Sequence, residues 1–244
     1  MTGQLVGTIA ALYRYPVKSM RGEALAAADL GPHGLTGDWR YAFVRAGNAS
    51  AFPWLTARQV PDLLRYAPYF AGPGDPDRAT VRVLTPDGAD FAIDSPALRD
   101  ELAARYGAPV ALHHARAGVP DAAPVSLLGA ASVDDLAAIV GAPLAPLRFR
   151  PNIVIAAAGG QPYAEDGWVG RTLALGEGAA AARVRVDQRD PRCAMVTLDP
   201  ADAARNPAVL RAIAALRDNC LGVYGAVEQP GPLRAGDPVY LLDR

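Results

Sequence analysis

Cys193 and its neighbours are the part of this sequence that points most directly to chemistry, because a thiolate is both a nucleophile and a soft metal ligand. An alternating run over residues 182–187 precedes it and a loop containing Pro200 follows, which predicts a thiol at or just after the end of a strand. Arg189 and Arg192 provide nearby positive charge, which favours the ionised form. The alternative is a buried free cysteine that packs as a small apolar side chain.

Lys18 and Ser19 lie in a second segment that could bind a ligand, Tyr-Pro-Val-Lys-Ser-Met-Arg-Gly over residues 15–22. A lysine, a hydroxyl group and backbone N–H groups in one loop can hold an anion. Further positive charge follows at Arg40, which begins a strand-like run, and at Arg58 in Thr-Ala-Arg-Gln. The alternatives are a solvated lysine at a strand end and arginines in surface ion pairs.

A third candidate segment is Arg-Phe-Arg-Pro-Asn-Ile-Val-Ile, over residues 148–155. In a strand, alternation would place Arg148, Arg150 and Asn152 on one face. Pro151 cannot donate to a sheet ladder, which predicts an edge or a bulge where a side chain could be aimed at a ligand.

The remaining polar residues give weaker signals. Glu165 and Asp166 could be partners of the arginines, proton donors or part of a solvated turn. The three histidines lack metal-ligand spacing with Cys193. We expect Cys220 to be structural, since it lies between a predicted helix and a predicted strand.

Length and composition limit the classes of function. The 244 residues are 51% hydrophobic, which is enough for one large domain or two closely packed ones. A net charge of −1 disfavours a general nucleic-acid binder. No apolar stretch approaches the ~20 residues that span a bilayer, and the N-terminus lacks a basic region and a cleavage motif. We therefore expect a cytoplasmic protein with no nucleic-acid or membrane partner.

Strands must position most of these residues. The 24 glycines and 22 prolines imply many turns. Strand-like runs recur at residues 5–13, 39–45, 80–84, 91–93, 110–113, 148–156, 183–187, 221–227 and 239–242. Pro86-Asp87-Gly88 predicts a hairpin turn between two of them.

Three helices are predicted as connectors, and the fold class is mainly β. Residues 97–106 follow the helix-start signal Ser95-Pro96 and end before a glycine. Ser132 resembles the first residue of a capping box for a second helix, and residues 207–216 form a third. Strands and helices do not alternate and no standard Gly-rich phosphate loop occurs, which disfavours a Rossmann or P-loop fold. A composition shift over residues 107–125 predicts two closely packed β-rich units.

Together these segments resemble the MOSC domain family with its N-terminal β-barrel partner domain, in particular the amidoxime-reducing components and their bacterial counterparts. The motifs are Tyr-Pro-Val-Lys-Ser, Thr-Ala-Arg-Gln, Phe-Arg-Pro-Asn-Ile-Val-Ile, Tyr-Ala-Glu-Asp, Arg-Cys followed by Thr-Leu-Asp-Pro, and Gly-Asp-Pro-Val-Tyr-Leu. They occur in the family's order and span residues 5–242. The resemblance implies an N-terminal β-barrel domain over residues 1–115 and a MOSC domain over residues 116–244.

The resemblance also implies a molybdenum cofactor, Mo-molybdopterin, with a protein thiolate among the ligands of the metal. By motif, Cys193 would be this metal ligand and the central catalytic residue. The other cofactor-binding residues that the motifs imply are Lys18, Ser19, Arg40, Arg150, Asn152, Arg192 and Tyr224. Lysine, bidentate arginine and amide donors suit a phosphate-bearing pterin, which would lie between the two units.

Some positions depart from the family's pattern. Met20 stands where relatives often have cysteine, Pro191 where they often have serine, and Ala122-Ala123 where hydroxyl residues are common. These departures remove possible hydrogen bonds to the cofactor. Some bacterial relatives carry a C-terminal iron–sulfur domain, whereas this sequence ends two residues after Leu242. We therefore expect electrons to come from a separate protein.

The predicted function is the reduction of small N-oxygenated substrates, such as amidoximes or hydroxylamines, with electrons from a separate donor protein. Two alternatives stay open. One is a sulfur carrier that uses a Cys193 persulfide, and the other is a non-catalytic molybdopterin-binding module.

Overall fold

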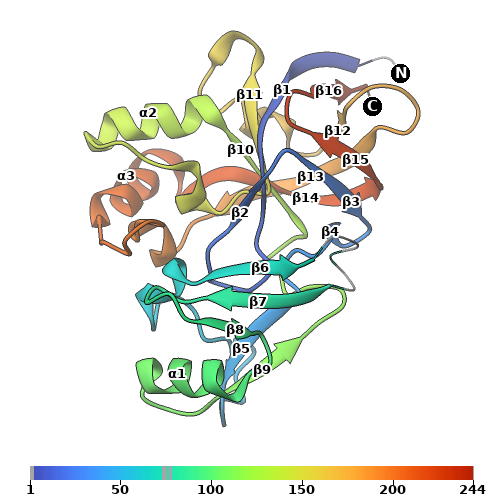
Figure 1. The fold of residues 1–244 in the computed structure, drawn as a ribbon. Helices are drawn as coiled ribbons and strands as arrows, with labels where there is room; N and C mark the ends of the chain where they lie inside the picture. The colour runs from blue at the N-terminus through green and yellow to red at the C-terminus, as the bar shows by residue number, and fades with distance from the viewer. Residues whose placement is uncertain (1–2, 73–75, 77–78, 244) are drawn as a thin grey trace.

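A computed structural model describes residues 3–72, 76 and 79–243, and it shows a mainly β fold (Figure 1). Its strands are β1 (Gly3–Arg14), β2 (Glu23–Leu25), β3 (Ala27–Gly31), β4 (Gly34–Leu35), β5 (Tyr41–Arg45), β6 (Ala67–Ala71), β7 (Thr80–Leu84), β8 (Asp90–Ala92), β9 (Val110–His114), β10 (Val125–Gly129), β11 (Ile153–Ala157), β12 (Thr172–Leu175), β13 (Ala182–Pro191), β14 (Cys220–Gln229), β15 (Gly231–Arg234) and β16 (Pro238–Leu242). The α-helices are α1 (Pro96–Tyr106), α2 (Ala130–Val140) and α3 (Pro207–Arg217). Short 3₁₀ helices are η1 (Pro61–Arg65), η2 (Pro146–Phe149), η3 (Ala158–Gly160), η4 (Ala164–Trp168) and η5 (Ala194–Thr197). The predicted fold class is confirmed.

Seven strands form a closed barrel in the order β11-β10-β14-β13-β12-β16-β1, and β1 pairs with β11 to close it. Neighbouring strands are antiparallel except for β10 and β11, which are parallel. Gly7 allows the closure, because a Cβ at this position would collide with the main chain of Ala156. Ile9, Leu127 and Val223 are among the buried side chains of the barrel core. The barrel thus brings the first strand of the chain beside segments from its second half.

A second hydrophobic core lies below the barrel in Figure 1, where the sheet β6-β7-β8, the pair β5-β9 and helix α1 pack together. Phe43 of β5, Val83 of β7 and Leu98 of α1 are buried in it. Gly88 has a φ of 87° in the antiparallel connection between β7 and β8, so the predicted hairpin turn is confirmed.

Helices α2 and α3 pack on one side of the barrel and form a third core with η2 and η5 (left in Figure 1). Phe149 of η2, Val196 of η5 and Ile213 of α3 are buried there. Because η5 begins directly after Cys193, this core supports the segment that carries the thiol.

The predicted helices α1 and α3 are confirmed, and a side-chain cap marks the start of each one. The Ser95 side chain accepts a hydrogen bond from the Ala97 N–H at 3.2 Å, and α1 ends at Gly107 in the left-handed conformation. Asn206 caps α3 in the same way. None of the helices that the structure describes has the length and apolar character of a membrane-spanning segment.

Two local predictions are wrong. Residues 148–152 do not form a strand: Arg148 and Phe149 belong to η2, and Arg150 has a left-handed φ of 54°. Pro151 has no N–H group for a ladder, and the strand begins only at Ile153. Ser132 also lies inside α2 rather than at its start, because the helix begins at Ala130 and the Ser132 hydroxyl donates to buried Glu165 at 2.9 Å.

The N-terminal segment contributes to both the barrel core and the second hydrophobic core. Its first strand, β1, is a member of the barrel, and β3 pairs with β15 beside the barrel core. Val17 and Phe43 are buried in the second core. The domain boundary between residues 115 and 116 stays a prediction.

Candidate functional site

A cavity of about 440 Å³ is lined by residues from both halves of the chain. The lining residues are Lys18, Ser19, Trp39, Phe52, Thr56, Arg58, Asp121, Ala123, Ser126, Arg148, Phe149, Arg150, Asn152, Asp190, Pro191, Arg192, Cys193, Met195, Val196 and Tyr224. This set includes all of the predicted site residues except Arg40, which is buried outside the lining next to Trp39. The fold therefore places Lys18 and Arg150 in the same cavity as Cys193.

Lys18 follows β1 and is held inside the protein. It is 3% exposed, so the alternative of a solvated lysine is wrong. Its ammonium group donates to the carbonyl oxygen of Val119 at 3.0 Å and pairs with Asp121 at 2.6 Å. Burial lowers the pKa of Lys18, and the Asp121 carboxylate opposes this change. Lys18 thus brings a positive charge to the cavity wall. The half-exposed carboxylate of Asp121 balances this charge.

Arg150 is a buried cation of the lining, and one of its terminal guanidinium nitrogens has no acceptor among the described residues. Its Nη1 donates to the carbonyl oxygen of Met20 at 2.8 Å, and its guanidinium carbon lies 4.2 Å from the ring centroid of Tyr15. Nη2 is buried and has no hydrogen-bond partner among the described residues. A buried N–H group without an acceptor is costly, and a bound anion would supply one. This atom is the feature that fits an anionic cofactor.

Cys193 follows the end of β13, as predicted, and its free thiol is exposed in the cavity. The thiol is therefore accessible, and the alternative of a buried cysteine is wrong. Arg192 does not point its donors at a ligand site: Nε donates to the Leu221 carbonyl at 2.7 Å and Nη1 to the Phe149 carbonyl at 2.7 Å. Arg192 instead fixes the backbone that leads into the thiol. Arg189 pairs with carboxylates outside the cavity lining.

Asp190 is a site residue that the sequence reasoning missed. Its carboxylate is 1% exposed, accepts from the Ser126 hydroxyl at 3.2 Å and pairs with Arg192 at 2.8 Å. Burial raises the pKa of Asp190 to about 6, although Arg192, Ser126 and Tyr224 oppose this rise. Burial also raises the pKa of Tyr224 above its usual range. The cavity wall therefore contains two neighbouring groups that can hold protons near neutral pH.

Asn152 connects the cavity wall to the barrel. Its Nδ2 donates to Asp38 at 2.8 Å, and its Oδ1 accepts from the Ser126 N–H at 3.0 Å. Asp38 also accepts from the Tyr15 N–H at 2.5 Å, and burial raises the pKa of Asp38 to about 7. Because both polar ends of Asn152 are used within the protein, its position favours a supporting role over direct contact with a ligand.

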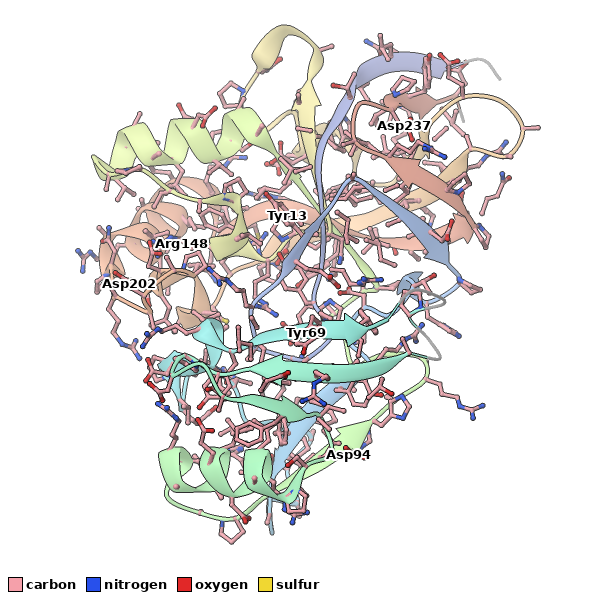
Figure 2. The ribbon with its side chains drawn as sticks, viewed as in Figure 1. Tyr13, Tyr69, Asp94, Arg148, Asp202 and Asp237 are labelled. Carbon is pink, nitrogen blue, oxygen red and sulfur yellow. The ribbon has the colours of Figure 1, made fainter. Side chains whose placement is uncertain are left out.

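Arg148, which is labelled in Figure 2, fixes the segment that follows Cys193. Its guanidinium pairs with Asp199 at 2.5 Å and donates to the Val196 carbonyl at 3.4 Å. Both partners lie within or just after η5. Arg148 therefore connects the η2 segment to the thiol-bearing segment.

Glu165 and Asp166 lie outside the cavity lining, so a direct role as proton donors there is wrong. Glu165 is 1% exposed and accepts from the Gly129 N–H at 3.1 Å and from Ser132. Asp166 pairs with Arg217 and Arg189, which agrees with the expectation of acids as arginine partners. Both carboxylates therefore stabilise contacts between η4 and the neighbouring strands and helices.

Three lining residues have a left-handed backbone, a conformation that few non-glycine residues adopt. The φ angles are 64° at Ser19, 54° at Trp39 and 54° at Arg150. Such conformations persist where surrounding contacts fix them, and they cluster at ligand sites. In this cavity they lie at positions from both halves of the chain.

Family models match both halves of this chain. The family model described as the MOSC domain matches residues 113–240, which is more than half of the chain. The model described as the MOSC N-terminal beta barrel domain matches residues 6–117.

One similar curated protein is the mitochondrial amidoxime-reducing component 1 of Mus musculus, 33% identical over 107 residues. That match covers 38% of this chain and 29% of the mouse protein's length. Among solved structures, the YUAD protein from Bacillus subtilis has a TM-score of 0.51 at 13% identity, with 99% of this chain and 98% of that chain covered. The similarity to YUAD concerns the fold alone.

Proposed function

This chain belongs to the MOSC domain family, and we propose that its cavity binds Mo-molybdopterin and that the protein reduces N-hydroxylated compounds. The name of the mouse relative supports the class of reaction. The observation that carries the proposal is the shared cavity of an accessible thiol, Cys193, and a buried cation with an unused donor, Arg150. A ligand that combines a soft metal ion with anionic groups would satisfy both.

In this proposal the lining residues have different tasks. The Cys193 sulfur would bind the metal, while Lys18 Nζ and Arg150 Nη2 would hold anionic parts of the pterin. Ser19 and Tyr224 would offer hydroxyl groups. Arg192 and Asn152 would support the site indirectly. Arg192 fixes the backbone beside Cys193 through its hydrogen bonds to two carbonyl groups, and Asn152 fixes the cavity wall through its hydrogen bond to Asp38.

The bound cofactor would supply two-electron chemistry at a metal centre. Overall, two electrons from a separate donor protein and two protons convert an N–OH group to N–H and water. Asp190 and Tyr224 are the groups in the cavity wall that would hold protons for this conversion, because burial favours their neutral forms. Burial of Asp190 also keeps bulk water from its carboxyl group.

Metal and pterin analysis tests the proposal. Protein from a molybdenum-replete host should contain Mo and pterin in equimolar amounts by native mass spectrometry, and it should reduce benzamidoxime to benzamidine when an electron donor is supplied. A persulfide on Cys193 without Mo would identify a sulfur carrier instead. Bound pterin without turnover of N-hydroxylated compounds would identify a binding module.

A further inference from the structure

Aromatic rings and cations alternate in a row that begins at the buried ring of Tyr15, behind the cavity lining, and continues along one wall to the exposed residues at the mouth. The guanidinium of Arg150 lies 4.2 Å from the Tyr15 ring centroid and 5.4 Å from that of Trp39. The Lys18 ammonium lies 4.7 Å from the Trp39 centroid and 5.7 Å from that of Phe52. The row ends at Arg58, whose guanidinium is 4.9 Å from the Phe52 centroid.

The charges along this row are not equally available. Lys18 pairs with Asp121, and the buried cations Arg148 and Arg192 elsewhere in the lining pair with carboxylates of their own. Arg58 is exposed, and its guanidinium makes no ion pair within the part of the chain that the structure describes. Among the described residues, no carboxylate balances the charge of Arg58, so this guanidinium can pair with an anionic group of a ligand.

Arg58 and Phe52 are presented at the mouth in different ways. Phe52 is 36% exposed, which is high for a phenylalanine ring. Gln59 Oε1 accepts from both the N–H and the hydroxyl group of Thr56, at 2.9 and 2.7 Å, and the Arg58 N–H donates to the Thr56 hydroxyl at 3.3 Å. These bonds fix the backbone at Arg58, so less entropy is lost when its side chain binds a ligand.

We propose that Phe52 and Arg58 form a substrate subsite that selects planar N-hydroxylated compounds carrying a carboxylate. The ring of Phe52 offers a face for a planar group, and the guanidinium of Arg58 can bind a carboxylate through two parallel N–H groups. This inference rests on the proposed function, since it names the substrate class of the same cavity. Both side chains are exposed, so they remain accessible to a substrate that binds after the cofactor.

Matched substrates test the charge preference in the cofactor-loaded protein. We expect the KM for 4-carboxybenzamidoxime to be about fivefold lower than that for benzamidoxime at low salt, the upper range for an exposed ion pair. Added salt should reduce this preference. Arg58→Gln should bring the two KM values together, whereas Phe52→Leu should raise both by a similar factor. Arg65→Gln is the control, because Arg65 is half-exposed and lies outside the cavity lining.

A second readout does not depend on turnover. Calorimetric titration with benzamidine and 4-carboxybenzamidine should show the same charge preference, and Arg58→Gln should remove it. If the wild-type protein reduces neither amidoxime but prefers the carboxylated amidine, the proposed function fails and the subsite stands. If both amidoximes are reduced with equal KM, the subsite is refuted alone. A loss of bound pterin in Arg58→Gln with an unchanged preference would assign Arg58 to the cofactor and overturn the inference.

Discussion

Cys193 and Cys220 differ in surroundings, which makes them a matched pair for mutation. Cys193 is exposed in the cavity, whereas the Cys220 thiol donates to the Asp218 carbonyl at 3.5 Å. Cys193→Ala removes the proposed metal ligand and should abolish benzamidoxime turnover, while Cys220→Ser keeps a hydrogen-bond donor and should retain most of it. Turnover, Mo content and thermal unfolding of both variants decide this. Retained turnover in Cys193→Ala would refute the metal-ligand role.

Arg150→Gln tests the unused donor. Loss of a charge-assisted hydrogen bond costs about 1.5–3 kcal/mol, and about 1.4 kcal/mol corresponds to a tenfold change in affinity. Pterin occupancy at limiting cofactor should therefore fall about tenfold or more. Arg99→Gln, on the exposed side of α1, should not change occupancy. Equal pterin content in Arg150→Gln and the wild type would remove Arg150 from the cofactor site.

At the scale of elements, one buried carboxylate holds the junction of β10, α2 and η4. Glu165 of η4 accepts from Gly129, where β10 ends, and from Ser132 inside α2. Glu165→Ala would leave both donors buried without an acceptor, at roughly 1–3 kcal/mol each. We expect a lower midpoint in urea unfolding, while Glu177→Ala, in an exposed loop, should stay within about 0.5 kcal/mol of the wild type. Equal midpoints for the two variants would show that the junction does not need this carboxylate.

At the scale of the whole molecule, buried acids make stability depend on pH. The folded protein raises the pKa of Asp38 to about 7 and that of Asp190 to about 6, mainly through burial. Because the folded state binds these protons more tightly than the unfolded chain, their contribution is complete below about pH 4 and is lost as pH rises through about 6 to 7. Each group contributes a slope of at most about 1.4 kcal/mol per pH unit.

Urea unfolding at several pH values checks this dependence. Asp190→Asn cannot titrate, so the difference in unfolding free energy between wild type and variant should shrink as pH rises from about 4 to about 6. The variant should in turn lose stability less steeply over this interval. A constant difference across it would mean that Asp190 titrates near its ordinary pKa in the folded protein.

The sequence alone predicted the features that depend on residues close together in the chain, such as helix ends and ligand-binding motifs. Ser95 and Gly107 predicted the ends of α1, because capping acts within a single helical turn. The motifs around Lys18, Arg150 and Cys193 predicted a shared set of ligand-binding residues, and these residues line one cavity. The alternation over residues 148–152 predicted a strand, and this prediction is wrong. Pro151 cannot donate to a ladder, and Arg150 turns the chain with a left-handed φ.

Only the tertiary structure decided the features that depend on distant residues. Strand β10 is buried along its whole length, and a short apolar run of this kind has no period that separates strand from helix. β1 closes the barrel by pairing with β11, which lies far from β1 in the sequence: Gly7, for example, is opposite Ala157. Asp190 became a site residue through Ser126 of β10 and Tyr224 of β14. Burial and hydrogen bonding determine its pKa, and both arise from neighbours that are close in space and far apart in the sequence.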